Sequence, residues 1–108
     1  MKLQSLSPLT EASYYILISL TEPLHGYGVM KRVEEYSNGR VRLAPGTLYG
    51  ALSTLTRHGL ITVTDDSGRR NKKVYAITRQ GRNLVEYEIA RLEEMYVNGK
   101  LAIDVSKE

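Results

Sequence analysis

The stretch that decides the fold is residues 45–64, PGTLYGALSTLTRHGLITVT. Pro45 is preorganised for the first turn of a helix. Leu48, Leu52 and Leu55 follow at spacings of four and three residues, which places them on one helical face. The stretch therefore predicts an amphipathic helix that begins at Pro45.

The pattern changes from helical to extended after His58-Gly59, a pair that favours the end of a helix. Residues 60–64 are β-branched and partly alternating, which predicts a strand. Residues 65–68 form a turn cluster, and residues 73–77 predict a returning strand. Together they predict a hairpin whose tip carries basic side chains.

Two helices are expected before this stretch. Thr10 can cap the first, because its hydroxyl can accept from a free amide of the first turn. Residues 12–20 are apolar on nearly all sides, which indicates burial on more than one face. A second helix begins near His25 and runs to about Tyr36, where the turn residues 37–39 end it.

One helix is expected after the hairpin. Thr78 can cap it, and it runs to about Val97, where Asn98-Gly99 ends it. Residues 100–108 are expected to form a short extra strand or a frayed end. The expected organisation is a winged helix-turn-helix domain at 1–78 and a C-terminal dimerisation helix with a short tail at 79–108.

The element order is helix, helix, helix, hairpin, helix. A single hairpin is not stable as a sheet and must pack on the helices. The expected fold is therefore mainly α with a β-hairpin wing, a winged helix-turn-helix whose third helix enters the major groove of DNA.

Composition narrows the classes of function. The 108 residues are 42% hydrophobic and 25% charged, which is typical of a small globular domain. Cysteine is absent, and two histidines without a carboxylate cluster indicate no metal site, so no cofactor is expected. No apolar stretch has the length of a membrane span or a signal peptide, so we expect a cytoplasmic protein without a membrane partner.

Positive charge gathers in the middle of the chain. The net charge is only +3, but residues 31–82 hold eleven basic and four acidic residues, a local charge of +7. Such a segment favours a surface that faces a polyanion, although small domains also segregate charge by chance.

Three motifs together resemble the signatures of PadR-type transcriptional regulators. They are Leu24–Gly28, then Pro45–Tyr49 with Leu52, Leu55 and Gly59–Ile61, and then the basic segment Gly68–Thr78 followed by Gly81. Asn71 and Val74 depart from the family pattern, which has a basic residue and an aromatic there. The resemblance covers roughly residues 9–97 and implies a dimeric repressor of the small type, with a single C-terminal helix. It also implies that this helix, with the first, forms the dimer contact.

The candidate DNA-binding residues share basic, hydroxyl or small side chains near the start of the third helix or at the hairpin tip. Lysine and arginine neutralise phosphates, and hydroxyls near the start of a recognition helix contact bases and phosphates. As alternatives, Thr47 only caps its helix, Tyr49 packs against the wing, and the basic tip is merely solvated. The candidates are Lys31, Pro45, Gly46, Thr47, Tyr49, Ser53, Arg69, Arg70, Lys72 and Lys73.

The candidate dimer residues form an apolar stripe on the last helix, with two residues of the first. The rest of the chain leaves little to cover this stripe, so a second copy is expected to do so. These residues are Tyr14, Leu17, Val85, Ile89, Leu92 and Tyr96. Relatives in the family respond to small apolar or aromatic compounds near the dimer interface. An effector pocket in this chain would use Tyr15, Ile18, Tyr87, Arg91 and Met95. The alternative is that these residues only pack in the dimer interface.

The leading hypothesis is a homodimeric repressor that binds a pseudo-palindromic operator in double-stranded DNA and is released by a small aromatic or apolar effector. The main alternative keeps the fold as a protein–protein interaction module without an operator. An enzyme is not expected, because the sequence holds no nucleophile–base pair, no predictable carboxylate pair and no cluster of metal ligands. RNA binding is disfavoured, since no aromatic stacking platform is predicted on a sheet.

Overall fold

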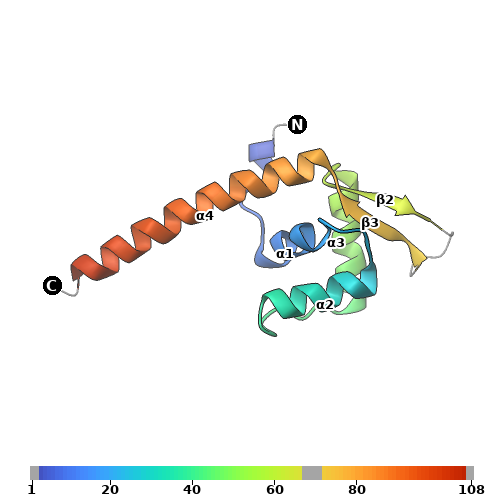
Figure 1. Ribbon diagram of the computed structural model, residues 1–108, viewed down its shortest axis with the longest axis horizontal. Helices are drawn as coiled ribbons and strands as arrows, with labels where there is room; N and C mark the ends of the chain where they lie inside the picture. The colour runs from blue at the N-terminus through green and yellow to red at the C-terminus, as the bar shows by residue number, and fades with distance from the viewer. Residues whose placement is uncertain (1–2, 67–71, 107–108) are drawn as a thin grey trace.

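A computed structural model describes residues 3–66 and 72–106 and confirms the winged helix-turn-helix (Figure 1). Three helices pack together, a small sheet covers one side, and a long helix projects away from them. The molecule is therefore elongated, with extents of 60 × 32 × 20 Å. The elements are η1 (Leu3–Leu6), α1 (Glu11–Ser19), β1 (Leu24–His25), α2 (Gly26–Tyr36), α3 (Pro45–Arg57), β2 (Ile61–Asp65), β3 (Val74–Ile77) and α4 (Arg79–Ser106).

The helix boundaries follow local chemistry. Thr10 caps α1 as predicted, since its hydroxyl accepts from the Ser13 amide at 3.0 Å. The N-cap of α3 is Ala44, which forms no side-chain cap, so the alternative that Thr47 serves only as the cap is wrong. Gly59 ends α3 with a φ of 75°, a left-handed conformation that favours glycine.

The sheet has three antiparallel strands in the order β1-β3-β2. The hairpin of β2 and β3, hereafter the wing, was predicted. Strand β1 was not, because two residues are too few to show alternation. Tyr75 lies at the centre of the sheet, paired with Leu24 on one side and Val63 on the other.

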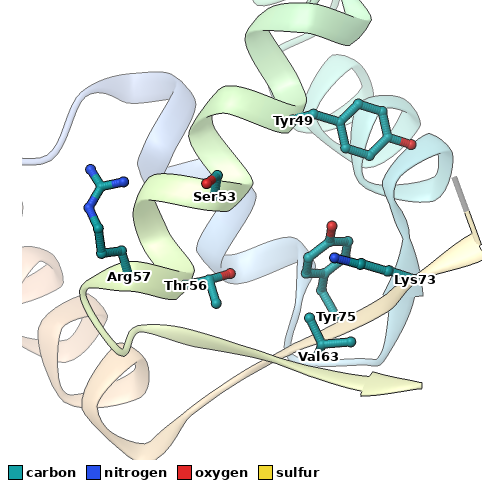
Figure 2. A pocket seen from close by; sticks show the side chains of 7 residues that line it. All are labelled: Tyr49, Ser53, Thr56, Arg57, Val63, Lys73 and Tyr75. Atoms are coloured by element: carbon teal, nitrogen blue, oxygen red, sulfur yellow. The ribbon is translucent and has the colours of Figure 1, made fainter. Parts of the chain in front are cut away.

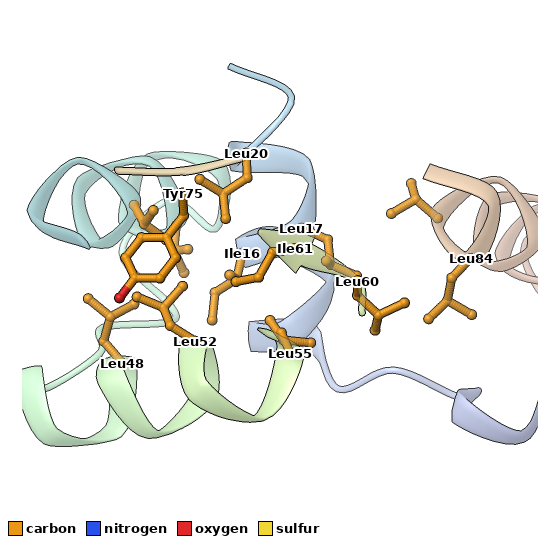
Figure 3. Close-up of a cluster of buried hydrophobic side chains, with 13 residues drawn as sticks. Ile16, Leu17, Leu20, Leu48, Leu52, Leu55, Leu60, Ile61, Tyr75 and Leu84 are labelled. Carbon is orange, nitrogen blue, oxygen red and sulfur yellow. The ribbon is translucent and has the colours of Figure 1, made fainter. Parts of the chain in front are cut away.

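The core lies among α1, α2, α3, the sheet and the start of α4 (Figure 3). Leu48, Leu52 and Leu55 of α3 are buried there, as their spacing predicted. Leu17 of α1 is also fully buried, at 0% exposure, so its assignment to the dimer interface is wrong. An apolar run on all sides of a helix does not reveal which side chain stays outside. The buried apolar residues are Ile16, Leu17, Leu20, Val29, Val33, Leu48, Leu52, Leu55, Leu60, Ile61, Tyr75, Leu84 and Val85.

Helix α4 is longer than predicted. It passes through Asn98-Gly99 and continues to Ser106, so the expected helix end and the expected strand or frayed tail are both wrong. A glycine inside a helix costs about 1 kcal/mol, which a helix of 28 residues tolerates. No helix in the described ranges has both the length and the apolarity needed to cross a membrane.

The start of α4 is fixed against the turn that follows α3. Thr78 caps α4 as predicted, because its hydroxyl accepts from the Gly81 amide at 3.1 Å, and the same hydroxyl donates to the Gly59 carbonyl at 2.7 Å. A Cβ at Gly81 would lie 2.2 Å from the Leu60 carbonyl oxygen, so only glycine fits there. This close approach places the start of α4 directly against Leu60, the residue before β2.

Candidate nucleic-acid interface

A groove runs between α3 and the wing (Figure 2). Its volume is about 630 Å³. Four side chains come from α3, and the others come from β2, β3 and the residue before β3. The lining residues are Tyr49, Ser53, Thr56, Arg57, Val63, Lys73 and Tyr75.

The walls of the groove offer hydroxyl groups. Tyr75 is largely buried, and Figure 2 shows its ring rising from β3 with the hydroxyl turned toward α3. The Thr56 hydroxyl donates to the Leu52 carbonyl at 2.7 Å, which leaves its oxygen free to accept. Ser53 lies between Tyr49 and Arg57 along the exposed face of α3.

The cations of the described residues differ in whether they form ion pairs. Four arginines lie in ion pairs, Arg32 with Glu22, Arg40 with Glu11, Arg42 with Glu34 and Arg91 with Glu88. Arg57 and Lys73, which line the groove, have no salt-bridge partner among the residues that the structure describes. The groove is thus one of the places where positive charge has no ion-pair partner, since Lys31, Lys72, Arg79 and Arg82 also form none within the described ranges, and such charge suits a polyanion.

Arg57 lines the groove, although its sequence position favours a solvent-exposed or ion-paired side chain over a DNA ligand. It lies one helical turn after Ser53, and this i, i+4 spacing was the available signal. Val63 and Tyr75 were also missed, because their place in the groove depends on how the wing folds back toward α3.

The predicted DNA-binding residues are only partly brought together. Tyr49, Ser53 and Lys73 line the groove. Pro45, Gly46 and Thr47 lie exposed at the start of α3, outside the lining.

Two predicted cations lie at other hollows. Lys31 lies beside Tyr27 on α2, with its Nζ 5.9 Å from the ring centroid. Lys72 lines a hollow with β1 residues, including His25. Arg69 and Arg70 lie outside the described residues.

The predicted dimer stripe on α4 is divided by burial. Val85 is only 8% exposed, because it packs into the core of its own chain. Ile89, Leu92 and Tyr96 are 50%, 41% and 63% exposed. Tyr14 is half-buried against the core and lines a cavity between α1 and α4.

The predicted effector residues do not form one site. A cavity of about 290 Å³ between α1 and α4 contains Tyr15 and Arg91, and Tyr15 also stacks on Tyr36 with ring centroids 5.6 Å apart. Ile18, Tyr87 and Met95 are not in the lining. The lining is Leu9, Thr10, Glu11, Tyr14, Tyr15, Glu88, Arg91 and Leu92.

Glu88, in the wall of this cavity, is a residue that the sequence pattern did not indicate. It is 1% exposed, and its carboxylate accepts from Arg91 Nε at 2.7 Å, Ser7 Oγ at 2.6 Å and the Leu9 amide at 2.6 Å. The Arg91 hydrogen bonds, with those from Ser7 and Leu9, lower the pKa of Glu88 from 4.5 to about 2. The same pairing raises the pKa of Arg91. Only the i, i+3 spacing of Glu88 and Arg91 is visible in the sequence.

Tyr14 borders the same carboxylate. Burial, together with the nearby Tyr15 and the negative charge of Glu88, raises the pKa of the Tyr14 hydroxyl. No group of three or more potential metal ligands occurs among the described side chains.

Comparison with known proteins identifies the family. Residues 16–87 match the model of the Transcriptional regulator PadR-like family. The transcriptional regulator YqjI of Escherichia coli is 33% identical over 69 residues, which are 64% of this chain and 32% of YqjI. The chain spans less than a third of the length of the curated relatives it matches.

Solved structures agree with this fold. A PadR family transcriptional regulator from Eggerthella lenta is 25% identical, with a TM-score of 0.69 over 83% of this chain and 80% of that one. Bordetella bronchiseptica BpsR, whose DNA binding is regulated by 6-hydroxynicotinic acid, is 24% identical, with a TM-score of 0.66 over 85% of this chain and 65% of that one. The chain belongs to the PadR-like family of transcriptional regulators.

Proposed function

We propose that this protein regulates transcription by binding double-stranded DNA, with α3 in the major groove and the wing beside it. The observation that carries the proposal is the groove between α3 and the wing, where Arg57 and Lys73 lie without ion-pair partners among the described residues. A phosphate strand seated between a recognition helix and a wing requires such cations.

The exposed face of α3 suits base and phosphate contacts. Ser53 and Tyr49 present hydroxyls along this face, and hydroxyls bond to either bases or phosphates. A Cβ at Gly46 or Gly50 would meet no atom within 4 Å, so both positions face open space. The bare backbone there allows DNA to approach α3 closely.

The active form in this proposal is a homodimer. Ile89, Leu92 and Tyr96 present a continuous apolar stripe on α4, and a second copy of α4 would cover it. Two-fold symmetry doubles the short site that one recognition helix reads, so the operator is pseudo-palindromic. Bound at a promoter, such a dimer acts as a repressor by occluding it.

The proposal also includes control by a small aromatic or apolar effector. The cavity of about 290 Å³ beside Tyr14 and Tyr15 has room for a compound of about one aromatic ring, and it lies between α1 and the dimer stripe. BpsR, of the same fold, responds to 6-hydroxynicotinic acid. An occupant of this cavity would change how α4 meets its partner.

Fluorescence anisotropy tests the proposal with duplex DNA from the region upstream of the gene, against a scrambled duplex at two salt concentrations. We expect selective binding that weakens steeply with salt, because several phosphate contacts release counterions. Light scattering on the same samples should give the mass of a dimer. A monomer that binds neither duplex at low salt would reject the proposal and favour a protein-interaction module.

A further inference from the structure

Tyr49 connects the groove to the neighbouring helix α2. Figure 2 shows its ring extending from α3 across α2, away from Arg57 at the other end of the groove. The ring lies directly against Gly26, the first residue of α2, which is buried. The Tyr49 side chain is therefore held by a second element as well as by its own helix.

This contact leaves no room for a side chain at residue 26. A Cβ at Gly26 would lie 2.7 Å from Tyr49 Oη and 2.9 Å from its Cε1 and Cζ. Real Cβ contacts are essentially never so short, so the ring would have to move. Gly26 has helical backbone geometry, so glycine is needed here for space and not for conformation.

The neighbouring glycines show that this demand is local. A Cβ at Gly28, two residues further along α2, would lie 3.4 Å from Leu24 Cδ2, an ordinary van der Waals contact. At Gly50, beside Tyr49 on α3, a Cβ would enter open space. Gly26 is thus the residue of α2 whose missing side chain sets the place of the Tyr49 ring.

We propose that Gly26 is a positioning residue for DNA recognition: it lets the Tyr49 ring seat on α2, which fixes the Tyr49 hydroxyl where α2, α3 and the groove meet. A ring already held in place needs no ordering when DNA binds, so its hydrogen bond contributes more to affinity. This inference rests on the proposed function, since it assigns Tyr49 a contact with DNA.

The test compares Gly26→Ala with the matched control Gly28→Ala in anisotropy titrations on the operator duplex. We expect Gly26→Ala to weaken operator binding about tenfold, the size of one well-placed contact. Gly28→Ala adds the same methyl group to the first turn of α2 but does not meet the Tyr49 ring. Its operator affinity should therefore stay within about twofold of the wild type.

A double-mutant cycle separates positioning from general damage. In the Tyr49→Leu background, Gly26→Ala should weaken operator binding no further, because the ring that it displaces is gone. NMR of protein with ¹³C-labelled tyrosine should show the Tyr49 ring signal, identified by its loss in Tyr49→Leu, shifted in Gly26→Ala and unshifted in Gly28→Ala.

Each arm has an outcome that overturns the inference. Additive losses in the cycle, an unshifted Tyr49 signal, or equal losses in the two glycine variants would each do so. If Gly26→Ala does not fold, Tyr49→Phe replaces it, because it keeps the ring and removes the hydroxyl, and unchanged operator affinity then overturns the inference. Absence of selective binding by the wild type instead rejects the proposed function itself.

Discussion

Among the described residues, charged side chains are paired in one region of the molecule, around Glu88, and unpaired in another, the groove between α3 and the wing. At the junction of the N-terminal segment, α1 and α4, the Glu88 carboxylate is buried and bonded to Ser7, Leu9 and Arg91. In the groove of α3 and the wing, Arg57 and Lys73 have no acidic partner in the described ranges. Breaking a buried, hydrogen-bonded charge pair destabilises the fold, whereas an unpaired surface charge is available to a ligand.

The largest expected effect is the pH dependence of stability that comes from Glu88. Its pKa is about 2 when folded and 4.5 in its ordinary state, so the ionised form stabilises the fold above about pH 4.5. This stabilisation is lost as the pH falls from 4.5 toward 2, and it amounts to about 3 kcal/mol. Urea unfolding of the wild type and Glu88→Gln should give free energies that converge over this range. Parallel curves would show that Glu88 does not titrate abnormally.

Removing the charge at neutral pH should have the next largest effect. Glu88→Gln leaves Arg91 without its carboxylate and weakens the bonds to Ser7 and Leu9, at a cost of about 2 kcal/mol in unfolding free energy. Glu86→Gln, an exposed position on the same helix, is the control and should change stability by less than about 0.5 kcal/mol. Equal losses in the two variants would remove the contrast between the two regions.

The groove cations should affect DNA binding and leave stability unchanged. Arg57→Gln and Lys73→Gln should each weaken binding to all duplexes by about 1 kcal/mol and lower the salt slope by about 1. Arg42→Gln is the control, because Arg42 already pairs with Glu34 at 3.0 Å. An effect of Arg42→Gln as large as that of Arg57→Gln would mean that ion pairing does not determine which cations contribute to DNA binding.

The smallest change sharpens the comparison on α3. Gly50→Ala adds a methyl group to open space and should stabilise the helix by about 0.5–1 kcal/mol. If DNA approaches the bare backbone there, the same variant should bind the operator several-fold more weakly. Thermal melting and anisotropy on one sample measure both changes, and unchanged operator binding would place the DNA elsewhere.

Local patterns predicted the elements, and contacts between distant segments decided what they missed. The leucine spacing of α3 and the caps Thr10 and Thr78 act within a few residues, so the sequence displays them. Glu88 bonds to Ser7, which lies 81 residues away, and no periodicity reveals such a pair. Leu17 was assigned to the wrong side of α1 for a related reason, since an all-apolar helix carries no sign of which face is covered by its own chain.

The candidate site was likewise predictable only where it depends on local sequence. Tyr49, Ser53 and Lys73 followed from their place near the recognition helix and wing, and they line the groove. Arg57 was not predicted as a DNA-binding residue. Its availability to DNA depends on having no acidic side chain nearby in the folded protein. The seat of Tyr49 on Gly26 is a contact between two helices that sequence spacing does not register.

The junction at Thr78 couples the wing directly to the long helix α4. One residue separates the wing strand β3 from α4, and Gly81 holds the start of α4 against the Leu60 carbonyl. At 1.5 Å per residue, the 28 residues of α4 form an arm about 42 Å long. The first turns of this arm are held by the buried Leu84 and Val85 and by the bonds of Glu88, so a tilt of about 5° in the projecting remainder moves its far end by about 2 Å. Residues inserted beside Thr78 would uncouple the wing from α4 while leaving the wing and α4 each folded.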